Sequence, residues 1–269
     1  MAVYKINRAI RCLDVHAVEQ ALLEQAARDD DQSGQRDDDN APPGVFVCQA
    51  TLLEWQKYVE SEAQEMKSRF MTFHDGGIYI VELAGIHESI ERHIECDIIL
   101  QGGRWLANRG ARYVATAPIL HEPDGSFGPE PEVPGAALPA GVVDWDEYHT
   151  LKIEVAVTQR WRDVERKAEI WRTYAGVQYV LCVRVSPTLR VADYALGIIA
   201  TNGQWEVPFS RQPIVGPQTL VRFDCRRLLG LEPGAALPQG FANGNDHVEI
   251  DLFRIVERRR HLRSLRVNQ

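Results

Sequence analysis

The sequence predicts a mixed α/β (α+β) fold, and three observations lead to this prediction. The chain has 269 residues, of which 45% are hydrophobic and 25% charged, as in a globular protein with a buried core. Segments with the apolar spacing of a helix alternate along the chain with short β-rich runs. We find no internal repeat, and no apolar run approaches the roughly 18–20 residues of a membrane span. This pattern excludes collagen-like, coiled-coil and wholly disordered chains.

The N-terminal half is expected to contain three helices and a hairpin. Apolar spacing predicts an amphipathic helix over residues 9–28. Residues 29–44 carry six aspartates together with Gly and Pro, which predicts a disordered acidic linker. Helices are expected over residues 51–69 and 86–108, with a hairpin between them whose turn is Asp75-Gly76-Gly77.

The C-terminal half is expected to hold most of the sheet. Hydrophobic β-rich runs predict strands, a polar segment between two of them predicts a helix, and Pro and Gly predict a long loop. The expected elements are strands over 111–120, 151–157 and 177–186, a loop over 122–148, a helix over 159–174 and a hairpin over 193–209.

Three features that can carry chemistry fall together in this half. Asp124 follows the strand expected over 111–120, and Glu154 stands in the middle of an apolar strand. A carboxylate there is costly unless it is paired, protonated or bound to a metal. Lys167 lies on the next helix, in a chain with only five lysines against 25 arginines. Two carboxylates and an ammonium suit a Mg²⁺ site for phosphodiester hydrolysis, because Mg²⁺ prefers oxygen ligands and lowers the pKa of a bound water.

Each of these residues also has a simpler interpretation. Asp124 in Pro-Asp-Gly is an ordinary turn residue, and Asp144 and Asp146 compete with it as ligands. Because side chains alternate along a strand, Glu154 could lie with Lys152 and Ala156 on a strand face that is more exposed to solvent. Asp163 and Lys167 could be a surface pair four residues apart, worth roughly 0.2–0.5 kcal/mol.

The order of the motifs resembles the PD-(D/E)XK nuclease superfamily, in particular its restriction-endonuclease-like proteins. The resemblance covers roughly residues 50–230 and rests on motifs that follow one another in the family's order. These are the helix and hairpin over 51–79, a helix opened by His87-Glu88, Pro123-Asp124, the strand from Glu154-Val155 to Thr158-Gln159, Asp163 with Lys167, and the strand over 176–183.

The resemblance implies a restriction-endonuclease-like core, a central mixed sheet flanked by helices. It implies that Asp124 and Glu154 hold Mg²⁺ or Mn²⁺ and that Lys167 is catalytic, because Ala156 occupies the usual position of the motif lysine. Supporting roles fall to Gln159 and Asp163, and to one carboxylate of the first core helix. Glu88, Glu91 and Glu95 share one face of that helix, and we favour Glu91, the middle one.

These inferences divide the chain into four parts. They are an N-terminal helix (1–28), an acidic linker (29–44), a nuclease-like domain (45–230) and a C-terminal extension (231–269) with an arginine-rich segment. The net charge of −8 argues weakly against nucleic acid as a partner. Residues 1–40, however, hold nine negative and five positive charges, so half of the net charge, −4, lies outside the expected nuclease-like domain. Residues 254–266 hold six arginines that could contact phosphates, form a solvated helix face or pair with the acidic linker.

The expected protein is a Mg²⁺-dependent endonuclease that acts on DNA, or on RNA. The alternative is an inactive nuclease-fold module that binds nucleic acid or a protein partner, which Ala156 and the long insert favour. A third hypothesis is that the chain is an unrelated α/β protein whose motif matches are accidental. Because the N-terminus lacks a signal-peptide pattern, we expect an intracellular, cytoplasmic protein, or a nuclear one in a eukaryote. We expect no membrane partner, and a homodimer is left open.

Overall fold

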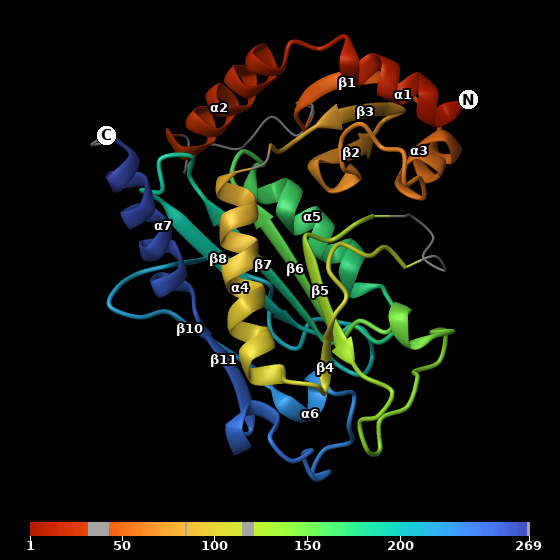
Figure 1. Cartoon of the computed structure of the whole chain (residues 1–269), viewed down its shortest axis with the longest axis vertical. Coiled ribbons are helices and arrows are strands. Elements are labelled where there is room, and N and C mark those ends of the chain that lie inside the picture. Colours follow the sequence, from red (N-terminus) through yellow and green to blue (C-terminus); the bar gives the residue numbers. More distant parts are fainter. Residues whose placement is uncertain (32–42, 84, 115–120, 268–269) are drawn as a thin grey trace.

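The fold is α+β and is built on a mixed central sheet, as the sequence predicts. The computed structural model describes residues 1–31, 43–83, 85–114 and 121–267 (Figure 1). Its largest sheet has the strand order β4-β5-β6-β7-β8-β9, in which β6 and β7 are parallel and the other pairs antiparallel. The strands are β4 (Leu106–Asn108), β5 (Gly125–Pro129), β6 (Leu151–Ala156), β7 (Tyr179–Val185), β8 (Ala192–Ile198) and β9 (Gln212–Pro213).

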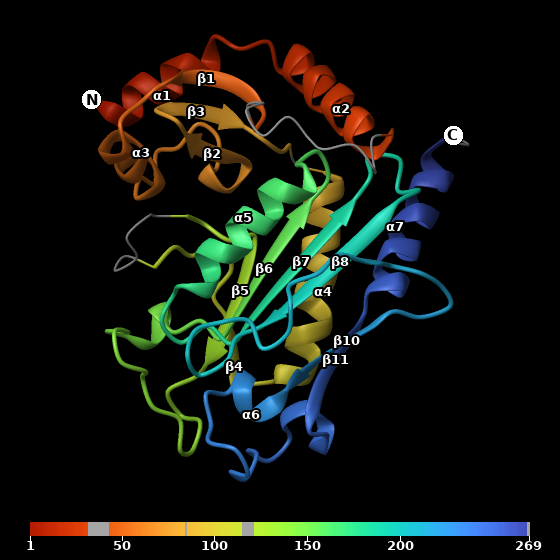
Figure 2. The same cartoon turned by 180° about the vertical axis from the view of Figure 1, so that it is seen from behind.

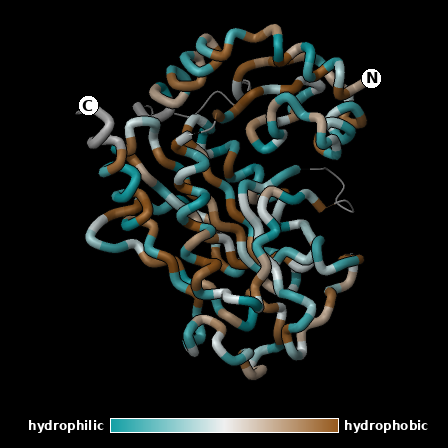
Figure 3. Tube along the Cα trace, viewed as in Figure 1, coloured by the Kyte–Doolittle hydropathy of each residue, from teal (hydrophilic) through white to brown (hydrophobic). Residues whose placement is uncertain are grey.

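Helices cover both faces of this sheet. Figures 1 and 2 show α4 (Ile86–Gly102) on one face and α5 (Trp161–Arg172) on the other. Successive residues of a strand point to opposite faces, so β6 contributes to two cores. Ile153 and Val155 join the larger core with α4, whereas Ala156 joins a smaller one with α5. Figure 3 shows the hydrophobic residues gathered along these inner strands.

The segments before α4 form a small layer with its own core. It contains α1 (Ala2–Arg11), α2 (Val15–Asp31), α3 (Leu52–Val59) and a sheet of order β1-β3-β2, with strands β1 (Val45–Gln49), β2 (Met71–His74) and β3 (Gly77–Ile80). The predicted hairpin at Asp75-Gly76-Gly77 is confirmed, and both Asp75 and Gly76 take the positive φ that such a tight turn requires. Trp55 and Tyr58 of α3 are fully buried in this core.

Glu82 links this layer to the central sheet. Its buried carboxylate accepts hydrogen bonds from the backbone N–H groups of Val157 (2.7 Å) and Thr158 (3.0 Å), just after β6. The hydroxyl of Thr158 donates to the other oxygen of Glu82 at 3.0 Å. The end of β6 is therefore held by a side chain from the N-terminal layer.

Three expected helices are wrong in extent. The helix expected over 9–28 is interrupted, because the Asp14 carboxylate accepts from the N–H groups of His16 and Ala17 and thereby starts α2. The helix expected over 51–69 ends at Val59, where the Gln64 amide binds its carbonyl oxygen. The helix expected over 86–108 ends at Gly102, before the strand β4.

Two expected strands are also placed differently. Residues 111–114 form no strand, and residues 115–120 of that prediction lie outside the described part of the chain. Instead, residues 125–129, which we expected in a loop, form β5. In the hairpin expected over 193–209, only a bridge between Ile199 and Trp205 forms, and β8 pairs with β9.

The C-terminal residues belong to the main core. β10 (Leu220–Asp224) and β11 (His247–Asp251) form a two-stranded antiparallel sheet, and α7 (Leu252–Val267) packs beside α4. Residues 231–269 thus contribute buried side chains such as Leu252 and Ile255 to the core of α4 and β6. The remaining short helices are α6 (Cys225–Leu228) and the 3-10 turns Ser68–Phe70, Trp145–Glu147 and Phe241–Gly244.

The predicted acidic linker lies largely outside the described residues, which resume at residue 43, although 29–31 belong to α2. All five cysteines are free thiols. Within the described ranges, we find no helix with the length and apolarity needed to cross a membrane.

Candidate functional site

Strand pairing brings the two predicted metal-binding carboxylates together. Gly125 of β5 lies opposite Ile153 of β6, and the N–H of Asp124 donates to the Ile153 carbonyl at 3.1 Å. Asp124 lies directly before this pairing, and its negative charge is near enough to raise the pKa of both Glu154 and Lys167. Asp124 therefore precedes β5, rather than following a strand as predicted, and still lies near Glu154.

Glu154 is held between two donors of α5. Lys167 Nζ lies 2.9 Å from Oε2, and Trp171 Nε1 donates to Oε1 at 2.6 Å. Burial raises the pKa of Glu154, an effect that the Lys167 charge opposes and the Asp124 charge reinforces. The carboxylates around Lys167 outweigh its own burial and raise the pKa of its ammonium to about 12. Helix α5, which follows β6, therefore supplies the cation that the sequence predicts, Lys167. It also supplies the indole donor Trp171, which was not identified from the sequence.

Asp124 is equally buried but only partly satisfied. Its Oδ2 accepts from the N–H of Val155 at 2.7 Å. His87 Nε2 lies 3.1 Å from Oδ1, within ion-pair distance but without the alignment of a hydrogen bond, so among the described residues Oδ1 has no hydrogen-bond partner. Burial opposes ionisation of Asp124, but the His87 and Lys167 charges outweigh it and hold the pKa of Asp124 below its ordinary value. Burial likewise lowers the pKa of His87, but Asp124 outweighs this effect and raises it to about 9.

Two carboxylates of α4, Glu91 and Glu95, are near enough to Asp124 for their charges to interact with it. Glu91, the predicted third carboxylate, binds Arg69 at 3.0 Å, and burial raises its pKa to about 7. Glu95 lies nearer to β5, because a Cβ on Gly125 would meet its Oε1 at 3.1 Å. That Oε1 is buried, and no residue in the described ranges forms a hydrogen bond with it. Burial raises the pKa of Glu95. A hydrogen bond with Asn108 and the charge of Arg69 oppose this shift, and the charge of Asp124 reinforces it.

The residues present fit a divalent cation through two carboxylates. In the part of the chain that the structure describes, no three His, Cys, Asp or Glu side chains gather as a metal cluster. Mg²⁺ needs fewer protein ligands, since it takes one or two carboxylates and fills its remaining positions with water and substrate oxygens. The buried Oδ1 of Asp124, which lacks a hydrogen bond, is the donor atom that such an ion would satisfy.

Lys152 is a second buried lysine near the site. In the sequence, only its closeness to Glu154 drew attention to it. It is fully buried on β6, where its Nζ lies 2.6 Å from His149 Nδ1 and 4.7 Å from the ring centre of Trp171. His149 Nε2 lies 3.0 Å from the Asp146 carbonyl, so Nε2 carries the proton and Nδ1 accepts from the lysine. Burial lowers the pKa of Lys152 to about 7. The contact with Trp171 connects Lys152 to the indole that binds Glu154.

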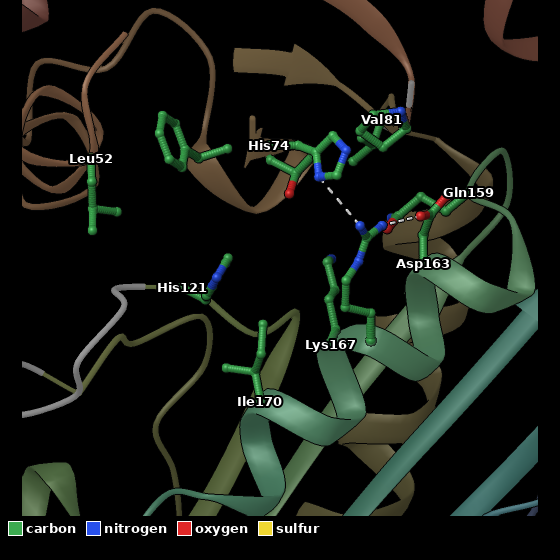
Figure 4. Close-up of a pocket in the computed structure, with 12 residues that line it drawn as sticks. Leu52, His74, Val81, His121, Gln159, Asp163, Lys167 and Ile170 are labelled. Atoms are coloured by element: carbon green, nitrogen blue, oxygen red, sulfur yellow. Dashed lines mark hydrogen bonds and ion pairs between the residues drawn. The ribbon is translucent and has the colours of Figure 1, made fainter. Parts of the chain in front are cut away.

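The supporting residues Gln159 and Asp163 lie beside the carboxylate pair, in a neighbouring pocket. This pocket of about 200 Å³ separates the N-terminal layer from α5 (Figure 4). Asp163 does not contact Glu154; its carboxylate binds Arg160 at 2.8 Å and also Arg166. Lys167 lines the pocket and also binds Glu154, so it belongs both to the pocket and to the carboxylate site.

Comparisons with known proteins assign no family to the chain. No family model and no curated protein matches the chain. Among solved structures, a protein from Anabaena variabilis described as a "putative nuclease belonging to DUF820" is similar, with 15% sequence identity and a TM-score of 0.43. The match covers 77% of this chain and 98% of that one. A likeness of this size leaves the chemistry of the site to be inferred from its own side chains.

Proposed function

We propose that this protein is a metal-dependent nuclease of the PD-(D/E)XK type that hydrolyses phosphodiester bonds of DNA, with RNA as the other substrate. The observation that supports this proposal is the proximity of Asp124, just before β5, Glu154 on β6 and Lys167 on α5. All three are buried or nearly so, and burial of charged groups is retained where it serves a site or a paired network.

Each residue has a defined role in the proposal. Asp124 and Glu154 would hold Mg²⁺ or Mn²⁺, with Glu91 as the supporting carboxylate. The bound ion would supply Lewis-acid polarisation of the phosphate and a water of lowered pKa. Lys167 keeps its proton at neutral pH, so its ammonium can orient the attacking water and stabilise the negative charge that develops on the phosphate. Glu154 fixes the direction of that ammonium through its Oε2.

One observation favours a second function, an inactive nuclease-fold module that binds nucleic acid or a protein. Both oxygens of Glu154 already accept hydrogen bonds, from Lys167 and from Trp171. A carboxylate oxygen has two lone pairs, so this leaves capacity for a metal but adds competitors for it. Ala156 at the usual lysine position points the same way.

The test combines metal binding with hydrolysis. Supercoiled plasmid and single-stranded circular DNA are each incubated with wild-type protein in Mg²⁺ or Mn²⁺, and Mn²⁺ binding is measured by calorimetry. Glu154→Gln and Lys167→Met are expected to lower the rate about 10²–10³-fold, the usual cost of removing one electrostatic stabiliser. Glu169→Gln, on an exposed residue of the same helix, is the matched control and should remain active. Folded wild type that binds no Mn²⁺ and cleaves no better than Glu154→Gln would refute the nuclease and leave the binding module.

A further inference from the structure

The pocket beside Lys167 has two chemically different walls. The N-terminal layer contributes apolar side chains to it, Leu52, Phe73 and Val81, and the core adds Ile170. Figure 4 shows Lys167, His121 and Ile170 pointing from the core toward the strand that carries His74. We call the apolar lining residues from both sides the apolar wall, and the nitrogen-bearing ones, His74, His121, Arg166 and Lys167, the nitrogen-rich wall.

The nitrogen-rich wall is cationic. Arg166 and Lys167 line it, and the one acid among the lining residues, Asp163, is already bound by Arg160 and Arg166. Arg166 also reaches the N-terminal layer, where its Nη1 lies 3.4 Å from His74 Nδ1. The Arg166 side chain is 48% exposed, so its guanidinium remains accessible to a ligand. An anionic group such as a phosphate suits this wall.

His121 is suited to a neutral role in the same pocket. Burial and the charges of Lys167 and Arg166 lower the pKa of His121 to about 4, so its ring is uncharged at neutral pH. The ring packs edge-on against Trp171, with 6.1 Å between ring centres. A neutral imidazole and the Phe73 ring offer flat surfaces of the kind on which nucleobases stack.

We propose that this pocket binds one unstacked nucleotide of the substrate strand, with its phosphate at Arg166 and Lys167 and its base against Phe73 and Ile170. The pocket volume of about 200 Å³ is below the roughly 300–1,000 Å³ of sites that enclose a whole small molecule, so it suits one unit of a longer chain. A base within a duplex is paired and stacked, so it would have to be flipped out first, at a free-energy cost that a single strand does not incur. The inference rests on the proposed function for the identity of the ligand, and it assigns single-stranded DNA or RNA as the substrate class.

The test measures binding with EDTA present, so that it does not depend on hydrolysis. Fluorescence anisotropy follows a labelled oligodeoxythymidylate and a labelled duplex of the same length. We expect wild type to prefer the single strand by at least about fivefold. Ile170→Trp, which fills the pocket without changing its charge, should weaken single-strand binding about 5- to 150-fold, the range for one lost base-stacking contact.

Charge is tested separately. Arg166→Gln should weaken binding and reduce the slope of log affinity against log salt by about 0.7, the value for one phosphate contact on a single strand. Arg222→Gln, on an exposed arginine of β10, removes the same charge outside the pocket and should have a smaller effect.

Three results would overturn the inference. They are equal affinity for single strand and duplex, an Ile170→Trp variant that binds like wild type, and displacement of the oligonucleotide by an equal concentration of a poly-glutamate peptide. If Ile170→Trp weakens binding while wild type hydrolyses nothing in Mg²⁺ or Mn²⁺, the proposed nuclease fails and the nucleotide pocket stands.

Discussion

Replacing Lys152 by methionine should remove a pH dependence of stability that the wild-type protein has above neutrality. Lys152 is fully buried, and its ammonium has a neutral imidazole and the faces of two aromatic rings as neighbours. Burial favours the uncharged amine and, against the opposing effect of the Glu154 charge, lowers the pKa of Lys152 from the ordinary 10.5 to about 7. Methionine has a similar length and needs no hydrogen-bond partner, so it can occupy the same space.

The magnitude follows from linkage between protonation and folding. Between pH 7 and 10.5 the unfolded chain keeps the Lys152 proton and the folded chain has released it, so stability rises with pH. Each pH unit in this window is worth about 1.4 kcal/mol, and the whole window about 5 kcal/mol. Below pH 7 both states are protonated and the folded state bears the full cost of the buried charge. The methionine variant has no proton to exchange and lacks this slope.

Urea unfolding at pH 7.5 and pH 9.0, with EDTA present, measures the effect. The difference in unfolding free energy between wild type and Lys152→Met should change by about 2 kcal/mol between these pH values, in favour of wild type at the higher pH. Lys57→Met, on an exposed lysine of α3, controls for the loss of one charge and should show a constant difference. A constant difference for Lys152→Met as well would mean that Lys152 stays protonated in the folded protein, which would refute the reasoning.

Two further predictions concern the contacts of β6. Lys167→Met should destabilise the protein by about 3–5 kcal/mol, because it leaves the buried Glu154 without its cation, and adding Glu154→Gln should recover most of this loss in urea unfolding. A double variant no more stable than Lys167→Met would contradict this. Glu82→Ala should cost about 1–3 kcal/mol for each of the two backbone N–H groups that lose their acceptor, measured the same way. A cost below about 1 kcal/mol in total would mean that water reaches those groups.

The strand β6 could be predicted because its apolar residues are continuous and Glu154 stands among them. The sequence left open whether Lys152, Glu154 and Ala156 shared a wetter face, and the structure answers that all three are buried. The reason is tertiary, because α5 covers this face. Periodicity within one strand cannot show which helix will return to cover it.

The strand β5 could not be predicted from its composition. Its sequence Gly-Ser-Phe-Gly-Pro is poor in the residues that favour strands. The segment pairs because it lies between β4 and β6, where every one of its residues is buried. A Cβ on Gly128 would meet the Tyr148 carbonyl oxygen at 1.8 Å, so glycine permits the backbone to approach there. The sequence placed Asp124 after a strand over residues 111–120, whereas in the structure it directly precedes the strand β5.

The position of the lysine on a helix, rather than on the strand, has a geometric basis. Lys167 and Trp171 are four residues apart, so they lie one turn apart on the same face of α5. Both donate to Glu154, one to each oxygen. A helix that returns over its own strand can therefore place an ammonium at the carboxylate as directly as a strand residue can. The sequence predicted the lysine, whose charge marks it, and missed Trp171, whose indole looks like an ordinary core residue until its N–H is seen to meet a buried acceptor.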